Sequence, residues 1–330
     1  MAHQVETMAY AGEVPWHGLG VRVTEGLTPD EMMVEAGLDW EVEKREMFYI
    51  DSNGNQKRGG DQTALVRSSD GMFLDTVSDM WNPVQNRDAF NFFDEYTRAG
   101  GMEMHTAGSL RDGKVIWALA KVNDSFALFG GKDKVESYLL LSNPHQFGRG
   151  VDIRFTPIRV VCNNTLSFSL NRKATLAISL NHRSEFDAEK AREALSEAHQ
   201  KMTEYKEMSE FLASKKFNES KLFEYFNHVF PRADRGSNSV KHQEMMDAFR
   251  NKDKKIVSRN AILAAETLEE QPGAEYGKGT WWQAYNTVTF MTNHLMGRNS
   301  DTRMQSLWFG QNKNRNIDAL GAAIEFANAA

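Results

Sequence analysis

Hydrophobic and polar residues alternate in short runs over the first half of the chain, with the two-residue period that strands require. Clusters of Asp, Asn, Ser and Gly separate these runs, and such residues accept the backbone angles of hairpin turns. The clearest clusters are at residues 51–55 and at Arg111-Asp112-Gly113. The pattern therefore predicts strands at residues 46–50, 63–67, 72–77, 105–110, 114–122 and 135–141.

Two helices are predicted within this strand-rich half. Thr28-Pro29-Asp30-Glu31 combines a capping threonine, a proline at the first helical position and acids in the first turn. A helix should therefore begin there and end near Gly37. Asn86 is predicted to cap a second helix that continues to about Arg98.

A further strand is predicted in the stretch of residues 154–166, which begins at Arg154. From Ile158 the residues alternate, so a strand would direct Ile158 to one face and Arg159 and Asn163 to the other. Asn163 and Asn164 then end the strand, because their short side chains bond to nearby backbone groups. An apolar strand thus has an arginine on its opposite face and a polar corner at its end.

The hydrophobic period becomes helical from Ser184 onward. Apolar residues recur at steps of three and four as far as Leu212, which predicts one long helix. Shorter helices are predicted at residues 220–229, 240–251, 254–270, 280–296 and 314–328. The predicted fold class is α+β: a mostly antiparallel sheet with packed helices in residues 1–184, followed by a helical region in residues 185–330.

The composition narrows the class of protein. The chain has 330 residues, is 41% hydrophobic and can bury a large core. It has no apolar run of about 18 residues and no signal peptide at its start, so we expect a cytoplasmic protein without a membrane segment. Its single cysteine excludes an intramolecular disulfide framework, and its nine histidines show no zinc-ligand spacing. The histidine spacing therefore predicts no metal, and the absence of phosphate-loop motifs predicts no nucleotide cofactor, so we expect neither a metal nor a cofactor.

The charge distribution gives the first functional indication. Net charge is −6, and residues 1–150 carry 14 basic and 23 acidic side chains. Residues 151–184 instead carry five basic side chains and one acidic one. Guanidinium and amide groups suit phosphate oxygens and base edges, so we predict a nucleic-acid site in this segment. Its candidate residues are Arg154, Arg159, Asn163, Asn164, Arg172, Lys173 and Arg183.

A second basic cluster lies between residues 232 and 259, with eight basic and four acidic side chains. Aromatic residues of the C-terminal helices would add base stacking if they were exposed. The candidates for stacking are Trp281, Trp282, Tyr285 and Trp308. In the alternative interpretation, the arginines pair with acidic groups of the N-terminal half and the tryptophans belong to the core.

Catalytic interpretations rest on few residues. Cys162 would be a nucleophile with His145 or His182 as its base. A cysteine within an apolar alternation is more often a small buried hydrophobic residue. Enzymatic activity is therefore the weaker expectation.

Several sequence blocks together resemble the phage/plasmid-like family, whose members have no settled activity. The blocks are Met1-Ala2-His3, Pro15-Trp16-His17-Gly18-Leu19-Gly20, Thr106-Ala107-Gly108-Ser109-Leu110, Arg159-Val160-Val161-Cys162-Asn163-Asn164-Thr165-Leu166 and Gly279-Thr280-Trp281. The family's Ser-His-Asp-Gly-like pattern is changed here to Asn143-Pro144-His145-Gln146, which keeps the histidine and loses the acid. This departure argues against a His/Asp pair.

The resemblance implies a bacteriophage or mobile-element protein in a bacterial cytoplasm. Within that setting we favour single-stranded DNA binding and strand annealing in DNA recombination, by a homo-oligomer that needs no nucleotide. Arg159, Arg172, Lys173 and Arg183 would contact phosphates. The alternative is a host-takeover or anti-restriction protein that acts by protein contact through its acidic surface.

Overall fold

The structure is a computed structural model. It describes residues 5–12, 19–98, 101–159, 164–165, 178–180, 188–232, 242–297, 303, 306–307 and 310–329. The strands are β1 (Val5–Tyr10), β2 (Val21–Arg22), β3 (Val42–Ile50), β4 (Gln56–Arg67), β5 (Phe73–Ser78), β6 (Met102–Leu110), β7 (Val115–Leu128), β8 (Asp133–Pro144), β9 (Val151–Arg159), β10 (Asn164–Thr165) and β11 (Ile178–Leu180). The helices are α1 (Pro29–Glu35), α2 (Asn86–Asn91), α3 (Asp94–Arg98), α4 (Ala188–Ser214), α5 (Glu219–Val229), α6 (His242–Arg250), α7 (Arg259–Thr267), α8 (Trp281–Phe290), the π-helix η3 (Met291–Leu295) and α10 (Gln311–Asn328).

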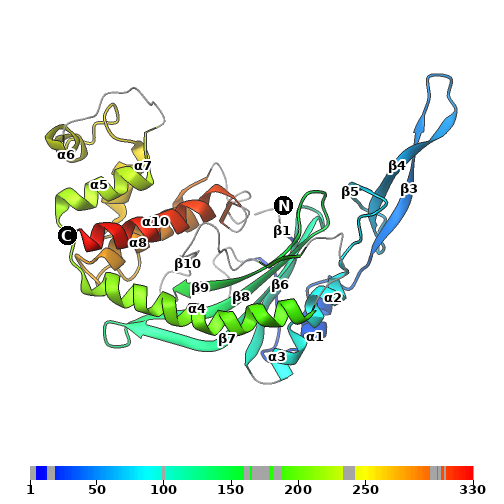
Figure 1. The fold of residues 1–330 in the computed structure, drawn as a ribbon, viewed down its shortest axis with the longest axis horizontal. Helices are drawn as coiled ribbons and strands as arrows, with labels where there is room; N and C mark the ends of the chain where they lie inside the picture. Colours follow the sequence, from blue (N-terminus) through cyan, green and yellow to red (C-terminus); the bar gives the residue numbers. More distant parts are fainter. Residues whose placement is uncertain are drawn as a thin grey trace. The chain divides into compact units, whose positions relative to one another are not determined.

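The chain folds into two compact units. The sheet unit comprises Met1–Asp124, Ser137–Thr156 and Lys173–Gln200. The helical unit comprises Ser125–Glu136, Pro157–Arg172 and Lys201–Ala330. Sheets of mostly antiparallel strands, followed by helices in the C-terminal region, confirm the predicted α+β class (Figure 1).

The larger sheet has the strand order β10-β9-β8-β7-β6-β1-β2, and β11 pairs with β9. β8 lies inside the sheet, as its nearly continuous apolar sequence predicts. The pair β1 and β2 is parallel, whereas β6 is antiparallel to both β1 and β7. The turn from β6 to β7 has positive φ at Arg111, Asp112 and Gly113, so the predicted hairpin is confirmed.

A second sheet of three strands has the order β3-β4-β5. Its first turn is organised by Asp51, whose carboxylate accepts hydrogen bonds from the backbone amides of Asn53 and Asn55 at 2.9 and 2.8 Å. Hydrogen bonds from Asn55, and then from Asn53, keep the pKa of Asp51 below its ordinary value. The Asp and Asn residues that predict this turn therefore form it.

The helices of the sheet unit agree only in part with the prediction. α1 begins as expected, because Thr28 and Glu31 form a reciprocal capping box. The prediction of a single helix from Asn86 to Arg98 was wrong, since this stretch consists of α2 and α3, with Gln85 as the first N-cap. Asn86 is buried, and its amide donates to the carbonyls of Leu38 and Trp40 at 2.9 and 3.2 Å.

Helix α10 packs against α8 and α5 in the helical unit, and α7 packs against both α5 and α8. The core between them is aromatic: Tyr225 meets Trp281 edge to face at 5.5 Å. The tip of the β7–β8 hairpin belongs to the same core, because the indole Nε1 of Trp282 donates to Asp133 at 2.8 Å. Asp133 is fully buried.

The remaining predicted elements have altered ends. The predicted helix at residues 254–270 begins later, at Arg259, because Ser258 caps it by accepting from the amide of Ala261. In the described part of the chain, every helix is too short or too polar to cross a membrane.

Replacing Trp282 with Phe tests the buried bond to Asp133. The variant should lower the free energy of unfolding by about 2 kcal/mol more than Trp281→Phe does, because a buried carboxylate loses a donor. Both indoles are fully buried, but the Nε1 of Trp281 has no hydrogen-bond partner in the described residues, so Trp281→Phe controls for ring size. Urea unfolding measures both values, and equal losses would contradict the assignment.

Candidate functional site

Three residues of the predicted nucleic-acid site, Arg154, Arg159 and Asn164, are described, and only through their backbone. Arg154 lies within β9, and Arg159 is the last residue of that strand. Asn164 opens β10 and is the register partner of Arg159 in an antiparallel pair, which places the two backbones within about 5.5 Å of each other. The side chains of these three residues lie outside the described part. The described part of the chain leaves out four residues of the predicted site entirely: Asn163, Arg172, Lys173 and Arg183.

The pairing of Arg159 with Asn164 brings together two of the predicted site residues. The part of the cluster in residues 166–177 and 181–187 is not described. Binding of nucleic acid by this segment stays a prediction.

The second basic cluster is described at residues 242–259, between α6 and the first turn of α7. Arg250 contacts Glu219 at 2.9 Å and Asp247 at 3.7 Å, and Lys252 pairs with Glu266. The side chains of Lys254, Lys255 and Arg259 are exposed and form no ion pair within the described residues. Three cations within six residues are therefore available to an external anion.

The stacking function predicted for the C-terminal aromatics is contradicted. Trp281, Trp282 and Tyr285 are fully buried, because they form the core that joins α8 to its neighbours. Trp308 lies outside the described residues. The core interpretation is therefore correct for the three described rings.

One of the two histidines considered as a catalytic base, His145, makes buried contacts that stabilise the fold. His145 is fully buried, and its Nε2 lies 2.9 Å from Oδ1 of Asn86. Since the amide of Asn86 already donates to two carbonyls, its oxygen accepts from the imidazole. His145 also meets Trp40 edge to face at 5.5 Å. His182 and Cys162 lie outside the described residues.

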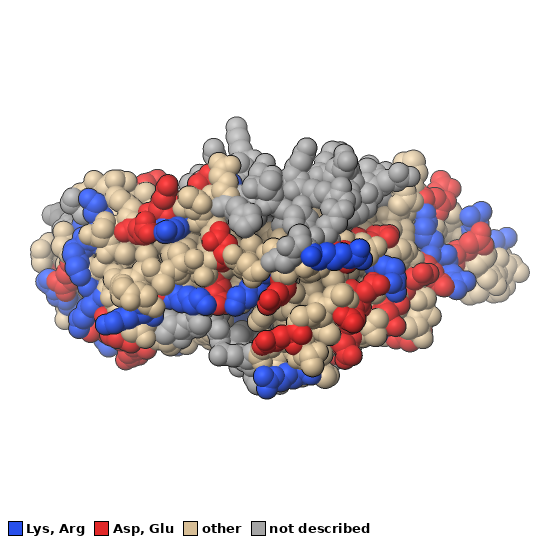
Figure 2. Space-filling model, turned by 90° about the horizontal axis from the view of Figure 1, so that it is seen from below, with Lys and Arg blue, Asp and Glu red and all other residues tan. Residues whose placement is uncertain are grey.

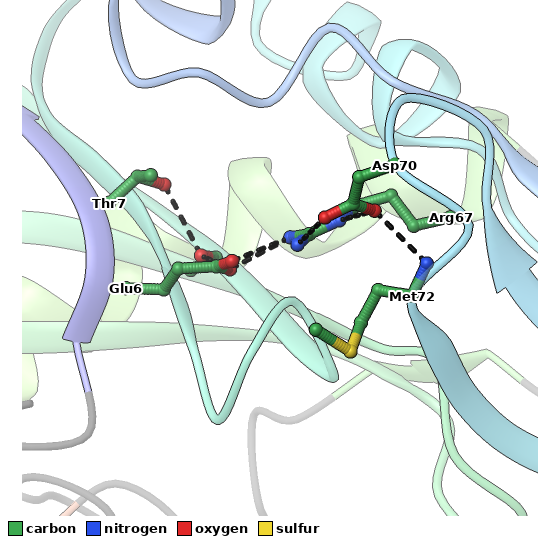
Figure 3. Close-up of polar contacts among 6 residues, drawn as sticks. Glu6, Thr7, Arg67, Asp70 and Met72 are labelled. Atoms are coloured by element: carbon green, nitrogen blue, oxygen red, sulfur yellow. Dashed lines mark hydrogen bonds and ion pairs between the residues drawn. The ribbon is translucent and has the colours of Figure 1, made fainter.

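Arg67, the last residue of β4, joins the two sheets of the sheet unit (Figure 3). Its Nη1 donates to both carboxylate oxygens of Glu6 on β1, at 2.8 and 2.9 Å. Its Nε and Nη2 donate to Asp70 at 2.9 and 2.7 Å. Ser109 on β6 donates to Glu6 at 2.8 Å, which extends the network across the larger sheet.

The Arg67 network comprises Arg67, Glu6, Asp70 and Ser109, and its guanidinium is nearly buried. The guanidinium lies 5.5 Å from the ring centroid of Trp40, and a Cβ at Gly113 would stand 2.8 Å from its Nη1. Hydrogen bonds from Arg67 lower the pKa of Asp70 to about 2, and the same contacts raise the pKa of Arg67 despite its burial. Its polar groups already have protein partners, so we interpret the network as structural.

The β3–β4 hairpin, unlike the guanidinium of Arg67, is exposed to solvent. We call its residues 44–62 the arm, and no side chain in it is buried. Phe48, Tyr49 and Ile50 are 51%, 56% and 67% exposed. The sequence predicted a strand at residues 46–50, without a prediction of its exposure. The position of these residues next to a hairpin turn was the one signal of exposure.

Basic and acidic side chains are mixed on the described part of the face drawn in Figure 2. Lys and Arg lie among Asp and Glu there and form no continuous basic surface. The described residues also contain no group of three or more His, Cys, Asp or Glu side chains that could hold a metal ion. Among the described exposed groups, the cations at residues 254–259 and the apolar side chains of the arm are suited to an external partner.

Comparison with known proteins places most of the chain in one family. Residues 73–316, well over half of the chain, match a family model described as a domain of unknown function, DUF932. No curated protein and no solved structure matches the chain.

The Arg67 network should contribute strongly to stability. Arg67→Leu should lower the free energy of unfolding by about 3 kcal/mol, because it leaves the largely buried carboxylate of Glu6 without its cation. Arg87→Leu breaks an ion pair with Asp30 in which both side chains are more than half exposed, so it should cost less than about 1 kcal/mol. Chemical denaturation compares the two, and equal costs would show that the buried network contributes no more than a surface pair.

Proposed function

This chain belongs to the DUF932 family, whose description assigns no activity, and we propose that it binds single-stranded DNA and anneals strands without nucleotide hydrolysis. The observation that carries the proposal is the group of exposed cations Lys254, Lys255 and Arg259, which have no ion-pair partner in the described residues. Cations held apart from carboxylates are available to displace counterions from a phosphate backbone.

The positive segment of residues 151–184 supplies the second contact in this proposal. Arg154, Arg159, Arg172, Lys173 and Arg183 contact phosphates. Asn163 and Asn164 shape the groove that holds the DNA strand. This segment carries five basic side chains and one acidic one in a chain of net charge −6, so electrostatic attraction favours it as a DNA contact.

The setting of the proposal comes from the sequence. The Arg159-Val160-Val161-Cys162-Asn163-Asn164-Thr165-Leu166 block resembles the phage/plasmid-like family, which supports a protein of a bacteriophage or other mobile element that acts in the bacterial cytoplasm. Strand annealing proteins work as assemblies that bring two strands together. We therefore propose a homo-oligomer, with the long helix α4 contributing to its assembly.

Salt-dependent binding of a fluorescent oligothymidine, followed by anisotropy between about 50 and 200 mM NaCl, tests this function. The wild-type protein should bind, and its affinity should fall steeply with salt. Lys254→Ala combined with Lys255→Ala should reduce the slope of log K against log salt by about 1.4, since each contact to a single strand contributes about 0.7. Arg159→Ala combined with Arg172→Ala should have a similar effect without unfolding the protein.

A charge-matched control separates local contacts from net charge. Arg87 pairs with Asp30 at 2.8 Å and Lys278 pairs with Glu269 at 2.7 Å, both at exposed positions. Arg87→Ala combined with Lys278→Ala removes the same charge and should leave the slope unchanged. Absence of binding by the wild-type protein at about 50 mM NaCl would refute the proposed function, and equal slopes for all variants would refute the assigned contacts.

A further inference from the structure

The arm, residues 44–62, presents aromatic rings to solvent on both of its faces. β5 pairs only with residues Gln62–Val66 of β4, so it leaves the outer part of the arm, residues 47–60, as a two-stranded ribbon (Figure 1). Successive residues of a strand point to opposite faces. Phe48 and Ile50 therefore share one face of the arm, and Tyr49 lies on the other. Exposed aromatic rings on both faces of a ribbon indicate an external partner.

The strand register gives each aromatic ring a cation as its neighbour. Phe48 is paired with Arg58, and Tyr49 is paired with Lys57. Directly opposed residues have Cβ atoms about 5 Å apart, so each face combines one ring with one positive side chain. Arg58 also contacts Glu46 at 3.2 Å, but both side chains are more than half exposed and such pairs contribute little.

The carboxylate nearest the tip of the arm is already engaged. Asp51 accepts the backbone amides of Asn53 and Asn55 and so belongs to the turn. Between residues 47 and 60 the other charged groups are Lys57 and Arg58, so the outer part of the arm carries a net positive charge. This charge favours an anionic partner.

We propose that the arm is a stacking surface for the bases of single-stranded DNA, with Phe48 and Tyr49 as the platforms and Arg58 and Lys57 as the adjacent phosphate contacts. Bases stack on aromatic rings in any sequence, and neighbouring cations follow the backbone. This inference rests on the proposed function and names the groups that hold the bases.

A second copy of the chain is a less suitable occupant. A stable protein interface buries about 800 Å² on each partner, more than three side chains of the arm's tip can supply. The unpaired edges of the arm also carry features that oppose strand addition. The register shifts between Glu46 and Phe48, and Gly60 in the opposing segment has a φ of +75°, which marks a β-bulge.

The test is binding of the same oligothymidine by the full chain in which Phe48 and Tyr49 are both changed to Ala. The dissociation constant should rise at least about 30-fold, because each stacked base contributes about 1 kcal/mol or more. The salt dependence should stay as in the wild type, since no cation is removed. Tyr49→Trp should bind at least as well as the wild type, because it keeps the ring.

Phe73→Ala is the matched control, since Phe73 is 48% exposed but lies on β5 outside the arm. It should bind like the wild type. If the wild-type protein binds DNA and the Phe48/Tyr49 variant binds equally well, the stacking surface is refuted while the proposed function stands. A change of oligomeric state in that variant with unchanged DNA affinity would instead assign the arm to protein contact. If the wild-type protein does not bind at all, the proposed function itself fails.

Discussion

The position of Arg67 between Glu6 and Asp70 is the constraint on which the sheet unit depends. A guanidinium that is nearly buried must have its charge balanced, and here one carboxylate comes from β1 of the larger sheet and the other from the turn after β4. The fork of donors fixes the end of β4 relative to β1. Because β4 is also one strand of the arm, the same contact holds the base from which the arm extends.

The local chemistry of turns and caps made much of the fold predictable. Asp51 and its asparagines, the Arg111-Asp112-Gly113 turn and the Thr28 capping box each act over a few residues, so the sequence contains all the information they need. The helical period after residue 184 is equally local and predicted α4 and the helices after it. Their ends were less predictable, as the later start of α7 at Ser258 illustrates.

Contacts between distant residues account for what the sequence did not reveal. Asn86 reads as a helix cap, yet its partners Leu38, Trp40 and His145 lie more than 40 residues away. Trp281 and Trp282 suit either a surface platform or a core, and only packing decides between them. The exposure of Phe48 and Tyr49 likewise depends on a distant segment, because β5 pairs with β4 only at residues Gln62–Val66.

The two kinds of DNA contact that we propose lie on different elements: cations that meet phosphates and exposed rings that stack with bases. Hydrogen exchange of the wild-type protein, measured by mass spectrometry with and without saturating oligothymidine, tests this division most directly. We expect slower exchange in residues 44–62 and 250–259 on binding, and unchanged exchange in α1. Unchanged exchange in both segments at saturation would contradict the proposed contacts.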